Sequence, residues 1–138
     1  MKLNFASILA WLPACVVMGF LFYASHLPGD EVHLPAFPYS DKVVHFLAYA
    51  VLGAGISLRF NLHRYLSQQN DPDIVTPAKD YFGCFVGIGY GLSDEIHQLF
   101  IPMRHFGLGD LSADMLGVIV GSTTYLSLAR KVKRSTIH

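Results

Sequence analysis

Long apolar segments alternate with short polar segments along the chain. The first apolar segment runs from Phe5 to Ala24 and contains no charged side chain. At about 1.5 Å per residue, a helix of that length crosses a hydrocarbon layer of about 30 Å. A cleaved signal peptide is the competing interpretation, but the segment exceeds the usual apolar region of such peptides, and no small-x-small cleavage site follows it. We therefore predict a membrane helix over residues 5–24.

Three further apolar segments follow, over residues 43–60, 81–100 and 112–129. Their uncharged cores are shorter than the first segment, and stretches of about ten to fifteen residues also form buried helices of soluble proteins. In each segment, however, the polar residues that complete the span lie near one end. A soluble four-helix bundle would instead carry charges along one face of every helix. The pattern predicts an all-α integral membrane bundle of four transmembrane helices in a single domain, residues 1–138.

The distribution of basic residues predicts the orientation of this bundle. Basic residues gather near both termini and around the middle connection: Lys2, Arg59, Arg64, Lys79, Arg130, Lys131, Lys133 and Arg134. The first connection offers only Lys42, and the third offers only Arg104. Because basic residues concentrate in cytoplasmic loops, both termini and the middle connection are predicted to be cytoplasmic. The first and third connections would then lie outside.

Composition narrows the functional classes. The chain has 138 residues, of which 52% are hydrophobic and 14% are charged, and its ten basic residues balance its ten acidic ones. An ordinary soluble domain has about 25% charged residues. A neutral, apolar chain is a poor fit to a nucleic-acid binder, because it has no net positive charge that would attract a polyanion. Cys15 and Cys84 lie inside apolar segments, which argues for packing roles rather than a disulfide or a metal site.

Most of the acidic residues and histidines converge on the predicted outer side. Three pairs are spaced four residues apart, so each pair shares one face of its helix: Asp41 and His45, Asp94 and Gln98, and Asp110 and Asp114. Glu95 continues a row of glycines at every fourth position: Gly83, Gly87 and Gly91. Rows of small residues mark close helix contacts in lipid. The carboxylates of this segment are therefore predicted to face the bundle, where intramembrane ionisable groups usually have a function.

Three motifs combine these polar residues with glycine and proline. They are Asp41-Lys42-Val43-Val44-His45-Phe46, then Asp94-Glu95-Ile96-His97-Gln98 with Pro102 and Arg104, then Asp110 with Gly117 and Gly121. Together they resemble the VanZ-like membrane protein family, over a region from about Ser25 to Gly121. The Asp-Glu-x-His-Gln block with its downstream Pro-x-Arg is the most specific element. Met103 stands where the family tends to have Gly, and Asp114 stands where Asn is usual.

The resemblance implies a multi-pass protein of the bacterial cytoplasmic membrane with an outward-facing site. The family's namesake is associated with resistance to the glycopeptide antibiotic teicoplanin through an unresolved change at the cell surface. The expected partners are therefore a membrane lipid, a lipid-linked cell-envelope precursor or a glycopeptide, and a homo-oligomer is an open alternative. The resemblance does not indicate a catalysed reaction.

Three hypotheses stay open for the polar cluster. In an enzyme, Asp94 or Glu95 would act as general acid or base on an envelope lipid, and His45 would share protons with it. Gln98 would orient the substrate, while Arg104 with Lys42 would hold a phosphate or carboxylate. In a binding protein, the same pocket, including Asp41, Asp110 and Asp114, would recognise a precursor or antibiotic without chemistry. In a non-catalytic membrane protein, these residues would form a structural network across the helices.

A cofactor stays unassigned at this stage. A hard divalent cation could be held by Asp41, Asp94, Asp110 or Asp114, since carboxylate oxygens are its preferred ligands. Carboxylates on three helices can equally pair with bases, so the spacing alone selects no metal. We therefore assign no metal ligand from the sequence.

Overall fold

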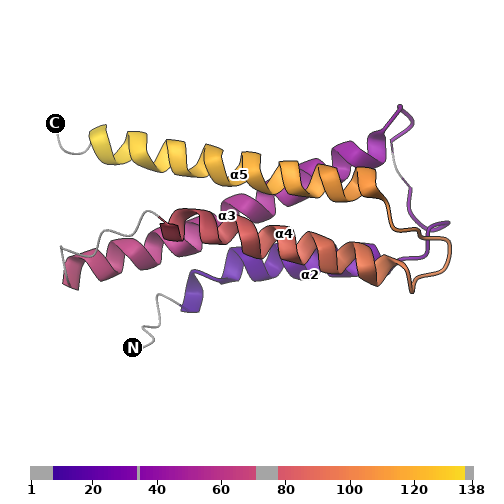
Figure 1. The fold of residues 1–138 in the computed structure, drawn as a ribbon, viewed down its shortest axis with the longest axis horizontal. Coiled ribbons are helices and arrows are strands. Elements are labelled where there is room, and N and C mark those ends of the chain that lie inside the picture. Colours follow the sequence, from indigo (N-terminus) through magenta and orange to yellow (C-terminus); the bar gives the residue numbers. More distant parts are fainter. Residues whose placement is uncertain (1–7, 34, 71–77, 136–138) are drawn as a thin grey trace.

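The chain folds as an elongated bundle of helices. The computed structural model describes residues 8–33, 35–70 and 78–135, and within these ranges it contains four numbered helices and no strand. These are α2 (Leu12–His26), α3 (Ser40–Asn70), α4 (Ala78–Gln98) and α5 (Leu108–Ser135). The connections from α2 to α3 and from α4 to α5 lie at one end of the bundle, and the start of α2 and the end of α5 lie at the other (Figure 1). The all-α prediction is confirmed.

The helix boundaries differ from the predicted apolar segments. Part of the first predicted helix, residues 5–7, lies outside the described residues, and α2 begins at Leu12 with Pro13 in its first turn. Proline is tolerated there because the N–H groups of the first turn have no acceptor within the helix, so the N–H group that proline lacks costs no hydrogen bond. α3 extends ten residues beyond the predicted 43–60 segment, to Asn70. Arg59, predicted to mark the middle connection, therefore lies inside α3, where it is buried and packs over the Trp11 ring.

Two helical stretches, Ser40–Leu62 and Leu108–Val132, are long and apolar enough to cross a membrane. α2 is apolar but has 15 residues, which corresponds to about 22 Å of helix. Large apolar side chains that are more than half exposed lie on all four helices: Phe20, Phe22 and Tyr23 on α2, Leu47 and Val51 on α3, Phe82 and Phe85 on α4, and Leu116 and Leu128 on α5. An apolar exterior of this extent is typical of a surface that contacts lipid or a partner.

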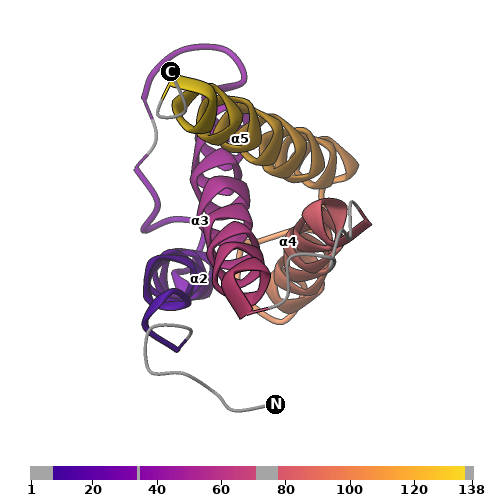
Figure 2. The same ribbon diagram turned by 90° about the vertical axis from the view of Figure 1, so that its left-hand side faces the viewer.

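α3 is the central helix of the bundle. In the view along the long axis it lies between α2, α4 and α5 (Figure 2), and it packs against all three. Its side chains Tyr49, Leu52 and Ile56 are fully buried, with Val118 of α5 beside them. This apolar core occupies the middle of the bundle and leaves the polar residues to the end where α3 and α5 begin.

Glycine allows α3 and α5 to approach closely. A methyl group added at Gly117 or Gly121 of α5 would collide with the main-chain carbonyls of Phe46 or Ala50 on α3. At the same interface, the Ser122 hydroxyl of α5 donates a hydrogen bond of 3.1 Å to the carbonyl of Gly53 on α3. Small residues at a helix interface permit this kind of backbone contact in lipid. The close approach fixes how the first turns of α3 and α5 face each other.

Candidate functional site

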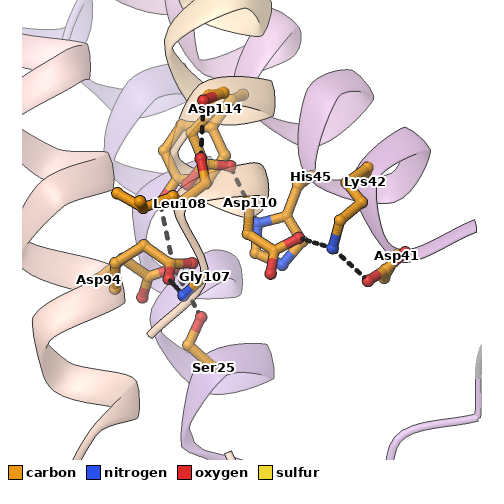
Figure 3. Close-up of polar contacts among 12 residues, drawn as sticks. Ser25, Asp41, Lys42, His45, Asp94, Gly107, Leu108, Asp110 and Asp114 are labelled. Carbon is orange, nitrogen blue, oxygen red and sulfur yellow. Dashed lines mark hydrogen bonds and ion pairs between the residues drawn. The ribbon is translucent and has the colours of Figure 1, made fainter. Parts of the chain in front are cut away.

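The predicted polar residues come together at one end of the bundle. Asp41 and His45 occupy the first turns of α3, whereas Asp110 and Asp114 occupy the first turns of α5, and these side chains face each other (Figure 3). Asp94 lies in the last turns of α4, beside them. The sequence places acids at the starts of α3 and α5, which run parallel, and at the end of α4, which runs antiparallel to both, so the topology gathers these acids at one end of the bundle.

Lys42 links α3 to α5 through an ion-pair bridge. Its Nζ lies 2.6 Å from Asp41 Oδ2 and 2.7 Å from Asp110 Oδ1. The three side chains are partly exposed, so solvent screens this bridge. Lys42 is therefore engaged with protein carboxylates rather than presented as a free anion-binding group.

A second carboxylate cluster lies deeper. Asp114 is 1% exposed, and its Oδ1 lies 2.9 Å from His45 Nδ1. Glu95 is fully buried, and its Oε2 accepts a 2.8 Å hydrogen bond from the Gly107 main-chain N–H. The other oxygen of each carboxylate, Asp114 Oδ2 and Glu95 Oε1, has no hydrogen-bond partner within the described part of the chain. His45, Glu95 and Asp114 are also the residues whose donor atoms could converge on a metal ion.

Asp94 is held by two hydroxyl groups from other helices. Its Oδ2 accepts hydrogen bonds from Ser25 Oγ of α2, at 2.8 Å, and from Tyr49 OH of α3, at 3.1 Å. Neither Ser25 nor Tyr49 was among the predicted site residues. A signal was available for Tyr49, because it lies one helical turn after His45 on the same face. Ser25 lies in α2, which continues to His26, instead of in the loop after it.

Arg104 fastens the connection between α4 and α5 to the end of α2. Its Nε donates to the Leu27 carbonyl at 3.1 Å, and its Nη2 donates to the Ala24 carbonyl at 3.0 Å. A guanidinium group suits the carbonyls left unpaired at a helix C-terminus. The preceding residue, Met103, has a φ of 59°, a left-handed conformation that favours glycine. The glycine expected at this position would adopt that conformation without strain.

A cavity of about 610 Å³ opens beneath this connection. Its polar wall includes the predicted residues Asp41, His45, Asp94, Gln98, Arg104 and Asp110. Its apolar wall is formed by α2 and α3 and includes Phe20, Leu21, Ala24, Val44 and Ala48. Gln98 is 4% exposed, and its Nε2 has no hydrogen-bond partner among the described residues. The cavity thus joins a polar end to an apolar side.

The structure divides the predicted site residues into two groups. Asp41, His45, Asp94, Gln98, Arg104 and Asp110 line the cavity. Lys42, Glu95 and Asp114 do not belong to its lining. His45 is shared, because it lines the cavity and also contacts Asp114. The catalytic and substrate-binding roles of all these residues stay predictions.

Fold and site together define an all-α bundle with an apolar exterior and a polar cavity at one end. The family model described as VanZ/LLP1 matches residues 10–130, so the chain belongs to this family. The match confirms the resemblance found from the sequence motifs. No curated protein and no solved structure matches the chain.

Proposed function

We propose that the chain is a multi-pass protein of the bacterial cell membrane, that α2 to α5 all cross the bilayer and that both termini are cytoplasmic. The exposed apolar side chains on all four helices support this arrangement. So does the separation of charge, because Arg130 and Lys131 lie at the end of α5, whereas the carboxylates gather at the opposite end. The cavity then opens on the extracytoplasmic side.

In this setting the cavity binds the headgroup of a cell-envelope lipid or lipid-linked precursor. The observation that carries this proposal is the buried Gln98 amide: Gln98 lines the cavity, and its Nε2 has no hydrogen-bond partner among the described residues. A buried donor without an acceptor is costly, and an acceptor on a ligand removes that cost. The apolar wall formed by α2 and α3 would accommodate the first part of an alkyl chain.

The charges of the wall indicate the kind of headgroup. Four acidic side chains line the cavity, Glu31, Asp41, Asp94 and Asp110, against the guanidinium of Arg104. Two donors of Arg104 are already used by carbonyl groups. Because Asp41 and Asp110 already pair with Lys42, this balance favours a headgroup that offers hydroxyl or amino donors to Glu31 and Asp94 and one acceptor to Gln98. A volume of about 610 Å³ suits such a headgroup, whereas a complete glycopeptide would engage only the rim.

Filling the apolar part of the cavity tests the proposal. Ala48→Phe places a ring at the wall, whereas Leu47→Phe places the same ring at the neighbouring position, on an exposed face. The full chain is purified in mild detergent with the lipid extract of its host, and retained lipids are identified by mass spectrometry. We expect wild type and Leu47→Phe to retain the same lipid species and Ala48→Phe to lose it. Equal retention by all three proteins would contradict a lipid site in this cavity.

Polar variants then test the headgroup contacts and any chemistry. Gln98→Leu removes the unpartnered amide, and Asp94→Asn keeps the shape of the side chain while removing its charge. We expect Gln98→Leu to weaken retention of the lipid by about tenfold, the effect of one hydrogen bond at the upper end of its range. If Asp94→Asn retains the lipid but a product formed by wild type disappears, the enzymatic hypothesis gains support. Retention without any product in either protein favours binding alone.

A structural network is the second candidate, and the contacts between helices favour it. Asp94 joins α2, α3 and α4 through two hydroxyl groups, and Lys42 joins α3 to α5. A satisfied polar network of this kind fixes the register of a bundle without any ligand. If Gln98→Leu and Asp94→Asn leave lipid retention unchanged but lower the unfolding midpoint, this candidate replaces the binding site.

A further inference from the structure

Three side chains from three helices form a group at the edge of the cavity: His45 lines the cavity wall, whereas Glu95 and Asp114 are buried and do not belong to the lining. His45 of α3, Glu95 of α4 and Asp114 of α5 each contribute one donor atom, and these atoms lie within 4.8 Å of one another. We propose that His45, Glu95 and Asp114 bind one divalent transition-metal ion such as Zn²⁺ or Mn²⁺. The proposal does not depend on lipid binding, because it rests on the donor atoms of these three residues, of which only His45 lines the cavity.

The unpartnered oxygens are an independent indication of a ligand. Glu95 is fully buried and Asp114 is 1% exposed. Each carboxylate is oriented by one oxygen: Gly107 N–H donates to Glu95 Oε2, and His45 contacts Asp114 Oδ1. The remaining oxygens, Glu95 Oε1 and Asp114 Oδ2, have no hydrogen-bond partner within the described residues. Buried acceptors of this kind are rare in native proteins unless an ion or water satisfies them.

The nearby basic groups do not fill this role. Lys42 pairs with Asp41 and Asp110, and Arg104 donates to two main-chain carbonyls. Two carboxylates beside a neutral imidazole carry a charge of about −2, which one divalent cation neutralises. Asp94, by contrast, is satisfied by two hydroxyl groups and needs no cation. The cluster therefore has the charge and the free donors that an ion requires.

The donor set selects the class of metal. One imidazole nitrogen and two carboxylate oxygens suit Zn²⁺ or Mn²⁺, whereas Mg²⁺ and Ca²⁺ prefer oxygen ligands alone. With bonds of about 2.0–2.2 Å, two donors on a tetrahedral ion lie about 3.3–3.6 Å apart, so donors as far as 4.8 Å apart must approach by about 1.2–1.5 Å to close the site. Gly91 leaves room for it, because a methyl group there would lie 3.5 Å from Asp114 Oδ2. Three protein ligands also leave a coordination position open.

The test measures the metal content and stability of the purified full chain. The protein is stripped with a chelator in detergent, dialysed against Zn²⁺, Mn²⁺ or Mg²⁺, and analysed by mass spectrometry of the bound metal. We expect one Zn²⁺ or Mn²⁺ per chain and no retained Mg²⁺. Loading with either bound metal should also raise the midpoint of thermal unfolding. A wild-type chain that retains none of these metals and shows no change in midpoint would overturn the proposal.

Isosteric variants locate the ion. Glu95→Gln and Asp114→Asn each remove one ligand charge while keeping the shape of the side chain. Changing a residue that only hydrogen-bonds to a metal ligand already weakens metal affinity about 10- to 100-fold, so we expect a loss of at least about 100-fold for each variant. Asp94→Asn is the matched control, since it changes a buried carboxylate outside the ligand set and should bind metal as wild type does. Equal loss in Asp94→Asn would refute the assignment.

A surface histidine pair provides the second control. His26 Nδ1 lies 3.3 Å from His97 Nε2 on the exposed side of α2 and α4, where adventitious metal binding is expected. His97→Gln removes this pair and should leave the retained metal and the thermal shift unchanged. If His97→Gln abolishes metal binding while Glu95→Gln preserves it, the ion belongs to the surface pair and the buried site is refuted.

Discussion

Individual glycines determine how closely the helices pack. A methyl group at Gly121 would collide with the Ala50 carbonyl, which belongs to a rigid helix backbone and cannot move aside alone. Gly89 of α4 faces open space, since nothing lies within 4 Å of a methyl group built there. Both residues are helical glycines, but the structure has no space for a side chain at Gly121, whereas it has space for one at Gly89.

The variants Gly121→Ala and Gly89→Ala test this difference. We expect Gly121→Ala to destabilise the bundle by about 1–3 kcal/mol, the usual cost of overpacking a close contact. Gly89→Ala should be neutral or stabilising by about 0.5–1 kcal/mol, because alanine loses less conformational freedom in a helix. Denaturant titration of the purified protein in mixed micelles measures both. Equal effects of the two substitutions would contradict the contact between α3 and α5.

Residue-level prediction succeeded where a periodic pattern marked a face. The row Gly83, Gly87, Gly91 and Glu95 is buried in the bundle, as the spacing predicted. It gave no signal where the partner is a main-chain atom, because no side-chain pattern marks a carbonyl. The role of Arg104 toward an anionic ligand stays a prediction, but its hydrogen bonds to the carbonyls of Ala24 and Leu27 were not predicted. For the same reason, no sequence pattern indicated that the Gly107 N–H donates a hydrogen bond to Glu95.

Among the elements, hydropathy indicated the number and type of helices better than their ends. Residues 61–70 continue α3 although they include polar and basic side chains, because helix formation does not require an apolar environment. Similarly, α5 begins at Leu108, four residues before the apolar segment, which places Asp110 in its first turn. An acid there is favourable at the positive end of the helix dipole. Apolar composition marks where lipid can contact a helix, while capping and local hydrogen bonds mark where it ends.

The attachment of α2 depends on the connection between α4 and α5. Arg104 holds the last carbonyls of α2, and the Gly29 N–H donates to the Pro102 carbonyl at 3.1 Å. Hydrogen bonds from a charged donor contribute about 1.5–3 kcal/mol. We expect Arg104→Ala to increase amide exchange at residues 25–30 about tenfold or more, as measured by mass spectrometry. The middle of α5, residues 113–122, should exchange at the wild-type rate.

Arg104→Lys separates charge from geometry in this attachment. The lysine ammonium keeps the charge but lacks the planar fork that contacts two carbonyls at once. We therefore expect exchange at residues 25–30 to rise in this variant as well. Wild-type protection in Arg104→Lys would show that charge alone holds the end of α2.

For the whole molecule, the proposed topology is tested by labelling single cysteines in intact cells. In a Cys15→Ala, Cys84→Ala background, Pro38→Cys places a thiol in the exposed connection between α2 and α3, and Lys131→Cys places one near the exposed end of α5. We expect a membrane-impermeant maleimide to label Pro38→Cys in intact cells and Lys131→Cys only after the membrane is opened. Labelling of both thiols from the same side would contradict the extracytoplasmic cavity.

The acids of α4 have a consequence for how the chain enters the bilayer during synthesis. One acid at the centre of an inserting helix costs about 2.5–3.5 kcal/mol on translocon scales, and Asp94 with Glu95 adds two near one end of α4. The hydroxyl partners of Asp94, Ser25 and Tyr49, leave the ribosome before it. The Gly107 partner of Glu95 follows later. During insertion, Asp94 of α4 can therefore form its hydrogen bonds with α2 and α3, which are made earlier. Glu95 acquires its partner only once the chain leading into α5 has been made.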